Sequence, residues 1–406
     1  MTEPARAPIY LDHNATTPVD PRVVDEMTRM FLTCYGNSSS RTHAFGWQAE
    51  EAVELARRQV AELIGADKAK TIVFTSGATE SNNLALKGAV RALVRRGDHV
   101  VTQVTEHKAV LDTLKALERE GTKVTYLPVD REGRVDPERV AGALTDRTVL
   151  VSLMYANNEI GTVQPVAEVG RLCRERGVLF HCDAAQAFGQ LDVQVERDAI
   201  DLLSISAHKM YGPKGVGALY VAPRRPPIRL EPLLHGGGQE KGLRPGTLNV
   251  PGIVGLGAAA AIARAEGAAH ATRMAALRDR LWQGIEARLT HVHRNGPASA
   301  SGRLPNNLSV SFECIEGESL MMSMPELAVA SGSACTSATK EASYVLKAIG
   351  LGDELAHSSL RLGVGRGTTE AEVDTAIEVL TRGVERLRAM SPLWGAVSRR
   401  GARARA

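Results

Sequence analysis

The sequence predicts an α/β protein with a large domain built on a mainly parallel sheet and a second, smaller domain. Nearly continuous apolar, β-branched segments recur in the first half of the chain, as expected of strands covered on both faces. Helical segments alternate with them, which is typical of a parallel sheet. The pattern changes after about residue 260, and 406 residues are enough for such a two-domain unit.

Seven segments fit buried strands of the larger sheet. They are residues 71–77, 99–107, 123–130, 148–156, 178–186, 202–209 and 217–222. Residues 47–64 predict a helix, because Val53, Ala56 and Val60 fall on one face and Gly65 is a suitable stop.

The second domain is predicted to begin with a long helix and to continue with shorter strands. The helix is indicated by one apolar stripe, which consists of Met274, Leu277, Leu281, Ile285 and Leu289. The strand candidates are the segments NLSVSFE, LAVASGS and SSLRLGVG.

Composition excludes several classes of protein. With 49 basic and 46 acidic residues the formal charge is +3, too balanced for nucleic acid as the main direct ligand. The N-terminus has no apolar signal core, and the longest uncharged run, around NVPGIVGLGAAAAIA, falls short of a membrane span. We therefore expect a cytoplasmic protein that does not bind a membrane.

The five cysteines are odd in number and scattered, with no CxxC pair, which argues against a disulfide framework or a zinc site and favours a reducing compartment. We expect Cys173 on a helix and Cys182 and Cys314 on strands to act as small buried hydrophobes. The state of Cys34 stays open, and Cys335 stands apart because its segment, SGSACTS, is too small and flexible to pack a core.

The first predicted strand leads into a glycine turn and an expected helix start, in TIVFTSGATESNN. Free N–H groups there, with the Ser76 and Thr79 hydroxyls, are suited to hold a phosphate. A plain helix N-cap, which Ser and Thr commonly supply, is the alternative.

Three further reactive groups follow strand ends. Asp183 needs a cationic or hydrogen-bonding partner if it is buried; the ring nitrogen of pyridoxal phosphate is one answer, and capping of the next helix is the other. Lys209 would be a nucleophilic amine if desolvated, whereas a surface lysine is the ordinary case. His107 fits ring stacking or proton transfer, and a satisfied core or rim histidine is commoner.

All these groups fall at one edge of the predicted sheet. The carboxyl ends of the strands are where open α/β sheets bind ligands. A phosphate cradle, a histidine, an aspartate and a lysine at that edge together match the needs of a pyridoxal phosphate enzyme.

With these residues the chain resembles a cysteine desulfurase of the NifS/IscS type, within the pyridoxal phosphate transferase fold type I. The resemblance runs from PIYLDHNATTPVDP to about SPLWG, and SGSACTS resembles the subgroup with a longer, flexible cysteine loop. Its other motifs are FGWQAEEAVELAR, FTSGATESNNLALKG, TEHKAVLD, NNEIGTVQP, SAHKMYGPKGVGALY, HGGG with RPGTLNV, and RLGVGRGTT. We expect a large cofactor-binding domain with a seven-stranded sheet at residues 15–264. We also expect a small α/β domain at 1–14 and 265–390 that carries the cysteine loop, and a basic tail at 391–406.

The resemblance implies a role for each matching position. Lys209 carries the cofactor, Asp183 pairs with its ring nitrogen, and His107 stacks on its ring. The cofactor-binding set is Ala78, Thr79, His107, Asp183, Gln186, Ser206, His208, Lys209 and, from the other subunit, Thr247. Asn14, Asn158 and Arg361 are implied to hold the substrate carboxylate, which suits the planar fork of arginine, although Arg361 alone could equally form a surface ion pair. Sharing of the site implies a homodimer.

The implied reaction converts L-cysteine to L-alanine and leaves the sulfur on Cys335 as a persulfide, with Lys209 and His107 as the other catalytic residues. Gly332 and its small neighbours give the loop the backbone freedom that a travelling thiol needs. The loop has no basic residue to lower the pKa of the thiol, so His107 is our candidate to accept its proton, with the substrate as the alternative. No stable metal site is implied, and Cys335 would contact an iron–sulfur cluster only transiently.

Other functions stay open on the sequence. An aminotransferase, a selenocysteine lyase or a kynureninase-like hydrolase shares the cofactor motifs, but a transaminase has no need of the Cys335 loop. A sulfur-delivery scaffold that acts mainly through protein contacts is a third hypothesis, and a cysteine peptidase would need a Cys–His pairing apart from the cofactor set. The implied partners are an iron–sulfur scaffold protein and carriers for tRNA thiolation. The tail SPLWGAVSRRGARARA lacks the acidic, His-bearing finish of the enterobacterial type, which puts docking through the tail in doubt.

Overall fold

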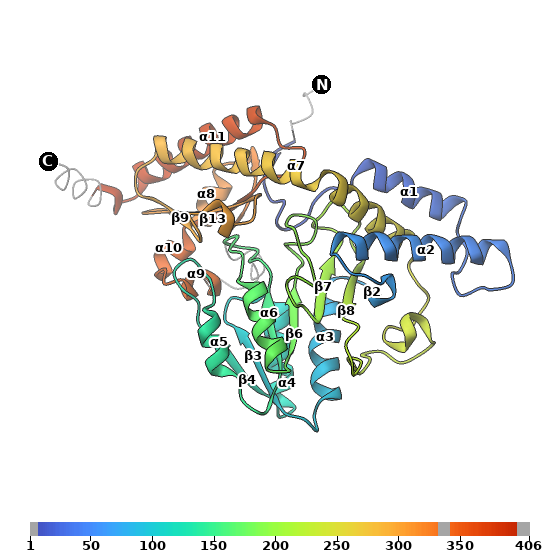
Figure 1. Cartoon of the computed structure of the whole chain (residues 1–406). Helices are drawn as coiled ribbons and strands as arrows, with labels where there is room; N and C mark the ends of the chain where they lie inside the picture. Colours follow the sequence, from blue (N-terminus) through green and yellow to red (C-terminus); the bar gives the residue numbers. More distant parts are fainter. Residues whose placement is uncertain (1–6, 332–341, 396–406) are drawn as a thin grey trace.

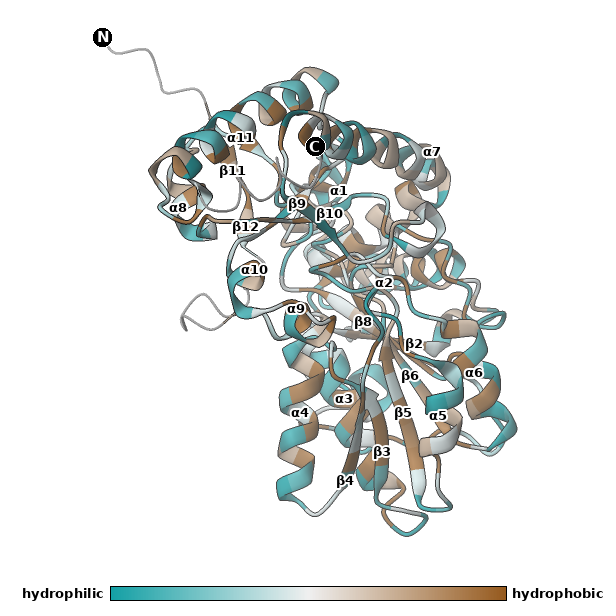
Figure 2. Cartoon of the chain, turned by 90° about the vertical axis from the view of Figure 1, so that its left-hand side faces the viewer, coloured by the Kyte–Doolittle hydropathy of each residue, from teal (hydrophilic) through white to brown (hydrophobic). Residues whose placement is uncertain are grey.

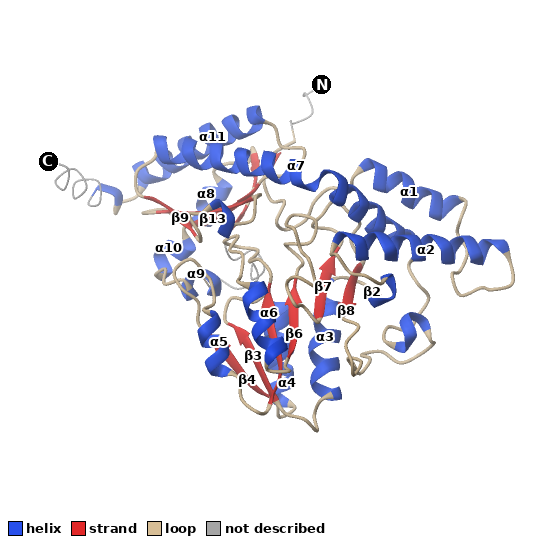
Figure 3. Ribbon diagram, in the orientation of Figure 1, coloured by secondary structure: helices blue, strands red, loops and turns tan. Residues whose placement is uncertain are grey.

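The computed structural model describes residues 7–331 and 342–395. Figure 1 shows a large sheet with helices on both faces, and a smaller sheet beneath two long helices. Figure 3, in the same orientation, shows the strands of the two sheets as separate groups. The chain therefore has the α/β architecture with a second, smaller part that the sequence predicts.

The large sheet has seven strands in the order β2-β8-β7-β6-β5-β3-β4. Its strands are β2 (Ile72–Thr75), β3 (His99–Gln103), β4 (Lys123–Leu127), β5 (Thr148–Met154), β6 (Leu179–Asp183), β7 (Leu202–Ser206) and β8 (Gly217–Val221). All seven predicted strands are confirmed. β8 runs antiparallel to both of its neighbours, and the other six strands share one direction. Their carboxyl ends therefore lie along one edge of the sheet.

Alternate residues of these strands enter two separate hydrophobic cores, because successive side chains of a strand point to opposite faces. Val100 and Leu150 belong to the core under α3 (Ala78–Ala92) and α4 (Lys108–Arg119), whereas Val101 and Val151 belong to the core on the other face. Figure 2 shows the brown, apolar strands between these two helical layers. The second layer contains α1 (Pro21–Leu32), α2 (Ala44–Leu63), α5 (Pro137–Ala143) and α6 (Val166–Glu175).

The longest helix, α7 (Val250–Arg288), packs against both parts of the chain. Its first half joins the large core, and its second half, which carries the predicted apolar stripe, joins the small one. α7 is long and apolar enough to cross a membrane by length and composition, but half of its most apolar window is buried inside the protein. It is a core helix. The predicted division between residues 264 and 265 falls within α7 and stays a prediction.

The apolar stripe that begins at Met274 does not predict the start of α7 at residue 250, which lies in the glycine-rich segment NVPGIVGLG. Pro251 lies in the first turn, where its missing N–H is harmless. The glycines allow close helix packing: a Cβ on Gly257 would lie 2.5 Å from the Ala56 Cα, and one on Gly255 would lie 2.8 Å from the Met27 sulfur.

The small sheet has four strands in the order β12-β13-β10-β9, all antiparallel. They are β9 (Val292–Asn295), β10 (Asn307–Phe312), β12 (Ala330–Ser331) and β13 (Ser359–Gly363), and β1 (Ile9–Tyr10) pairs separately with β11 (Leu327–Ala328). The helices are α8 (Gly317–Met322), α9 (Tyr344–Ala348), α10 (Asp353–His357) and α11 (Glu370–Met390), which begins with a Thr369–Glu372 capping box. Cys314 corrects one expectation: it lies in the turn after β10 with a φ of 66°, not on a strand.

The outer edge of β2 is covered by an ion pair between Arg57 of α2 and Glu240. The Glu240 carboxylate accepts the Phe74 N–H at 2.8 Å, and Arg57 Nη1 donates to the Ile72 carbonyl at 2.7 Å. Edge strands leave such backbone groups without a neighbouring strand. The pair therefore supplies two of the hydrogen bonds that an eighth strand would make.

Candidate active site

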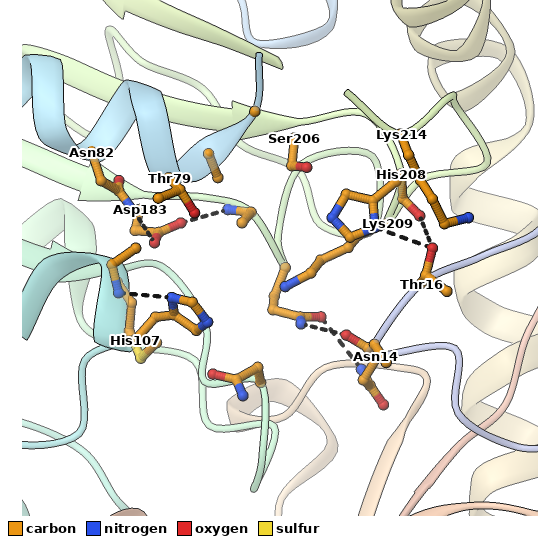
Figure 4. Close-up of a pocket in the computed structure, with 18 of the residues that line it drawn as sticks. Asn14, Thr16, Thr79, Asn82, His107, Asp183, Ser206, His208, Lys209 and Lys214 are labelled. Carbon is orange, nitrogen blue, oxygen red and sulfur yellow. Dashed lines mark hydrogen bonds between the residues drawn. The ribbon is translucent and has the colours of Figure 1, made fainter. Parts of the chain in front are cut away.

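A cavity of about 480 Å³ opens at the carboxyl edge of the large sheet. Eleven of the predicted site residues line it: Asn14, Ala78, Thr79, His107, Asn158, Asp183, Gln186, Ser206, His208, Lys209 and Arg361. Figure 4 shows the Lys209 side chain extending into the middle of this pocket. Thr247 is exposed, and it is not among the described residues that line this cavity. Cys335 lies outside the described residues.

The turn between β2 and α3 forms one end of the cavity. Gly77 has a φ of 151°, and a Cβ on Gly217 of β8 would lie 2.7 Å from the Gly77 Cα, so both positions favour glycine. Among the described residues, no side chain caps the start of α3. Its first N–H groups, with Thr79 and Ser206 beside them on the cavity wall, form a surface suited to a phosphate.

Asp183 stands at the end of β6 and is 4% exposed. Its Oδ2 accepts the Asn82 side-chain amide at 2.7 Å, and its Oδ1 accepts the Ala185 N–H at 2.9 Å. Both donors are neutral, so the buried carboxylate is oriented without being neutralised. A cationic ring nitrogen would complement it, which is the role that pyridoxal phosphate enzymes give to such an aspartate.

His208 is held from behind by the N-terminal segment. Its Nδ1 lies 3.1 Å from the Thr16 hydroxyl, and the Thr17 hydroxyl donates to its carbonyl oxygen at 3.0 Å. Burial, and then the charges of Lys209 and Lys214, lower the pKa of His208 to about 4. The imidazole is therefore neutral, and its other nitrogen remains for a ligand in the pocket, as Figure 4 indicates.

His107 is the N-cap of α4, and its Nδ1 accepts the Ala109 N–H at 3.1 Å. Burial lowers the pKa of His107, and the charge of Lys209 adds to this effect. The preceding Glu106 is fully buried. Its carboxyl group accepts the Met154 N–H and the Gln103 amide, and burial raises its pKa well above the ordinary value. The Glu106 carboxyl group thus connects the end of β3 to the end of β5 beside His107.

Arg361 reaches the cavity from β13 of the small sheet and is 3% exposed. Its Nη2 pairs with Asp12 Oδ1 at 2.7 Å, and its Nη1 donates to the Asn158 carbonyl at 3.2 Å. Asn14 connects to the same wall, because its amide donates to Gln186 Oε1 at 3.4 Å. The predicted substrate-binding residues therefore meet between the two sheets, and the alternative of a surface ion pair for Arg361 is wrong.

Sequence reasoning missed several residues that support this site. Asn82 lies one helical turn after Ala78 and donates a hydrogen bond to Asp183. Helical spacing places Asn82 on the same face as Ala78, but its contact with Asp183 can be inferred only when the order of the strands is known. Asp12, Thr16 and Lys214 belong to motifs quoted above, but their partners Arg361 and His208 cannot be found from sequence spacing. Within the described residues no cluster of three potential ligands is placed to hold a metal ion.

The comparisons with known proteins agree with this geometry. The model of the family "Aminotransferase class-V" matches residues 9–375. The chain belongs to that family. It is 58% identical over 389 residues to "Cysteine desulfurase IscS" of Anaeromyxobacter dehalogenans, covering 96% of this chain and 95% of the relative. Within the family it therefore groups with the cysteine desulfurases.

Two solved structures are also similar. A "NifS-like protein" superposes with a TM-score of 0.85 at 39% identity, covering 92% of this chain and 98% of the other. "SspA in complex with cysteine" superposes with a TM-score of 0.77 at 36% identity, covering 89% and 100%. These similarities confirm the predicted fold class and family, and they favour desulfurase chemistry over the transaminase, lyase, hydrolase and peptidase alternatives.

Proposed function

We propose that this cysteine desulfurase takes the sulfur of L-cysteine onto Cys335, with pyridoxal phosphate held in the cavity at Lys209. The observation that carries the proposal is the convergence of Lys209, Asp183 and His107 on one cavity of about 480 Å³. The proposed substrate is consistent with the desulfurase relatives and with the cysteine bound to the SspA protein.

The residues present fit the cofactor. The uncapped start of α3, Thr79, Ser206 and His208 would hold its phosphate, and the buried Asp183 would meet its ring nitrogen. Gln186 and His107, on the wall between them, are the proposed contacts for the rest of the ring. When bound, pyridoxal phosphate withdraws electrons from the Cα of an amino acid attached to it.

The chain's own residues would divide the remaining work. Arg361 and Asn158, with Asn14, would orient the substrate carboxylate, and the Lys209 amine would remove the Cα proton. The Cys335 thiolate would then attack the substrate sulfur: an S–S bond forms, the C–S bond breaks, and its electron pair stays on the carbon that takes up a proton. Cysteine and thiol thus become alanine and persulfide.

We further propose that the protein acts as a homodimer. Tyr35, Phe45 and Trp47 are exposed by 65%, 47% and 54%, and the rings of Tyr35 and Phe45 lie 5.4 Å apart. Contiguous exposed apolar patches of this kind mark interaction surfaces. A groove of about 400 Å³ joins this segment to Gly238, Gln239 and Leu248. Thr247 projects from the same loop, as a residue shared with a second subunit would.

The persulfide is proposed to supply an iron–sulfur scaffold protein and other sulfur acceptors, including those of tRNA thiolation. This proposal rests on the sequence resemblance to the desulfurase family. Residues 396–406 of the basic tail lie outside the described part of the chain.

The proposal is tested by incubating the purified protein with L-cysteine under reducing conditions and measuring alanine and sulfide. Cys335→Ser is expected to lose both products while the protein keeps its cofactor absorbance. Cys34→Ser is the matched control and is expected to keep native rates, because Cys34 lies in the loop after α1 and does not line the cavity. Undiminished products from Cys335→Ser would refute the role of that thiol, and a native protein that cannot bind pyridoxal phosphate would refute the cofactor.

A further inference from the structure

Glu80 places a negative charge at the phosphate end of the cavity. It is the third residue of α3, lines the cavity and has a side chain that is 17% exposed. Burial alone would raise the pKa of Glu80, but the Ser76 hydrogen bond and the Arg244 guanidinium together hold its pKa below the ordinary value. The carboxylate is therefore ionised at neutral pH.

This charge has a structural use and an electrostatic cost. Glu80 Oε2 accepts the Ser76 N–H at 2.7 Å, and this hydrogen bond fixes the turn between β2 and α3. The same turn is the one that would receive a phosphate. A carboxylate beside a phosphate dianion weakens binding, because like charges repel strongly where water is partly excluded.

Arg244 offsets that charge. Its Nε lies 3.0 Å from Glu80 Oε1, and its side chain is 24% exposed. The loop that carries Arg244 is fastened nearby, because Glu240 binds both Arg57 and the edge of β2. β2 ends at Thr75 and leads directly into the turn at Ser76. The Arg244 guanidinium is therefore held close to this turn, where it balances the charge of Glu80.

We propose that Glu80 and Arg244 form a charge-balanced clamp that positions the phosphate-binding turn and preserves its affinity for a phosphorylated cofactor. This inference rests on the proposed use of pyridoxal phosphate. Glu80 orients the Ser76–Gly77 turn through a hydrogen bond that a neutral amide oxygen would also accept. Arg244 contributes its charge, so that the phosphate meets a neutral pair rather than a carboxylate.

The test uses apoprotein of the full chain, titrated with pyridoxal phosphate and, separately, with pyridoxal, and followed by absorbance and tryptophan fluorescence. Arg244→Gln is expected to weaken binding of pyridoxal phosphate on the order of tenfold, as one nearby unbalanced charge does. Pyridoxal has no phosphate, so its affinity is expected to stay within about twofold. Arg244→Lys keeps the charge and is expected to retain most of the native preference.

Removing the second charge is the decisive control. The double variant Glu80→Gln with Arg244→Gln is expected to recover pyridoxal phosphate binding to within about threefold of native, because no unbalanced carboxylate remains. Glu80→Gln alone is expected to bind at least as tightly as native. If the pair had only a structural role, the double variant would bind pyridoxal phosphate as weakly as Arg244→Gln or more weakly.

The outcomes separate this inference from the proposed function. A native apoprotein that does not bind pyridoxal phosphate would refute the proposed function itself. Native binding combined with an unchanged affinity of Arg244→Gln, or with equal losses for pyridoxal phosphate and pyridoxal, would overturn the clamp. If Arg244→Gln does not fold, weaker phosphate-dependent binding by Glu80→Gln would overturn it as well.

Discussion

His107 Nδ1 accepts the backbone N–H of Ala109 at 3.1 Å. A backbone N–H can only donate, so Nδ1 carries no proton and the neutral ring keeps its proton on Nε2. Burial and the charge of Lys209 lower the pKa of His107, which favours this neutral form. The ring is thus prepared to donate a proton from Nε2. This differs from the sequence-based hypothesis that His107 accepts the proton of Cys335, and it leaves the substrate as the better candidate for that role.

His107→Asn separates the chemical role of the ring from its role as a helix cap. Asparagine is a good N-cap, so the melting temperature is expected to stay close to native, whereas His107→Ala is expected to lose about 1 kcal/mol of stability. Both variants are expected to release alanine on the order of a hundredfold more slowly, as loss of a general acid predicts. Near-native turnover by His107→Asn would rule out a catalytic ring.

Arg361 and Asp12 form a matched pair of variants for substrate binding. Arg361→Lys loses the planar fork and is expected to raise the KM for L-cysteine roughly tenfold or more, with cofactor content unchanged. Asp12→Asn frees Arg361 from its internal partner at 2.7 Å and is expected to keep or lower the KM. An unchanged KM in steady-state assays of Arg361→Lys would show that the substrate carboxylate binds elsewhere.

His181 predicts part of the acid sensitivity of the fold. It is fully buried between the Ser152 and Ser204 hydroxyls, and burial lowers its pKa to about 4. Because the folded protein disfavours the charged ring, this contribution to stability is complete above the unfolded pKa of 6.5 and is lost as the pH falls toward 4. The loss amounts to about 3 kcal/mol.

Urea unfolding between pH 7 and pH 4 measures this effect. His181→Gln is expected to make the free energy of unfolding less dependent on pH, because one proton fewer is taken up on unfolding. This holds even if the variant is less stable overall. His13 and His208 still add to the pH dependence, because their pKa values are also lowered by burial. His235→Gln, at an exposed position, is the control and should reproduce the native slope. Parallel slopes for His181→Gln and the native chain would contradict the assignment.

The proposed homodimer predicts a change of oligomeric state on charging the aromatic surface. Tyr35→Glu is expected to sediment as a monomer and to retain cofactor less firmly, because Thr247 of a second subunit would no longer reach the site. Met322→Glu, at a position of α8 that is 84% exposed, is the control and should sediment as native. A native chain that sediments as a monomer at micromolar concentration would refute the dimer.

The sequence was most informative where local pattern and tertiary environment agree. The seven strands are continuous apolar segments because both faces of the sheet are covered, and the reactive groups at the ends of the parallel strands β3, β6 and β7 then fall on one edge. The start of α7 carries no apolar stripe, because its glycines allow close packing against α1 and α2. Pairs such as Arg361 with Asp12, or Glu80 with Arg244, join residues far apart in sequence. The hydrophobic periodicity that predicts helices and strands does not predict such contacts.

The ion pair of Arg57 with Glu240 also bears on the colloidal behaviour of the protein. An open β2 edge would be a template onto which strands of other molecules could add, and that addition is a common start of aggregation. Charged side chains occupy the Ile72 carbonyl and the Phe74 N–H, so an incoming strand would have to displace a buried ion pair before making its first hydrogen bonds. Glu240 therefore hinders the addition of strands from other molecules to the β2 edge, and it also holds the loop that carries Arg244 in place.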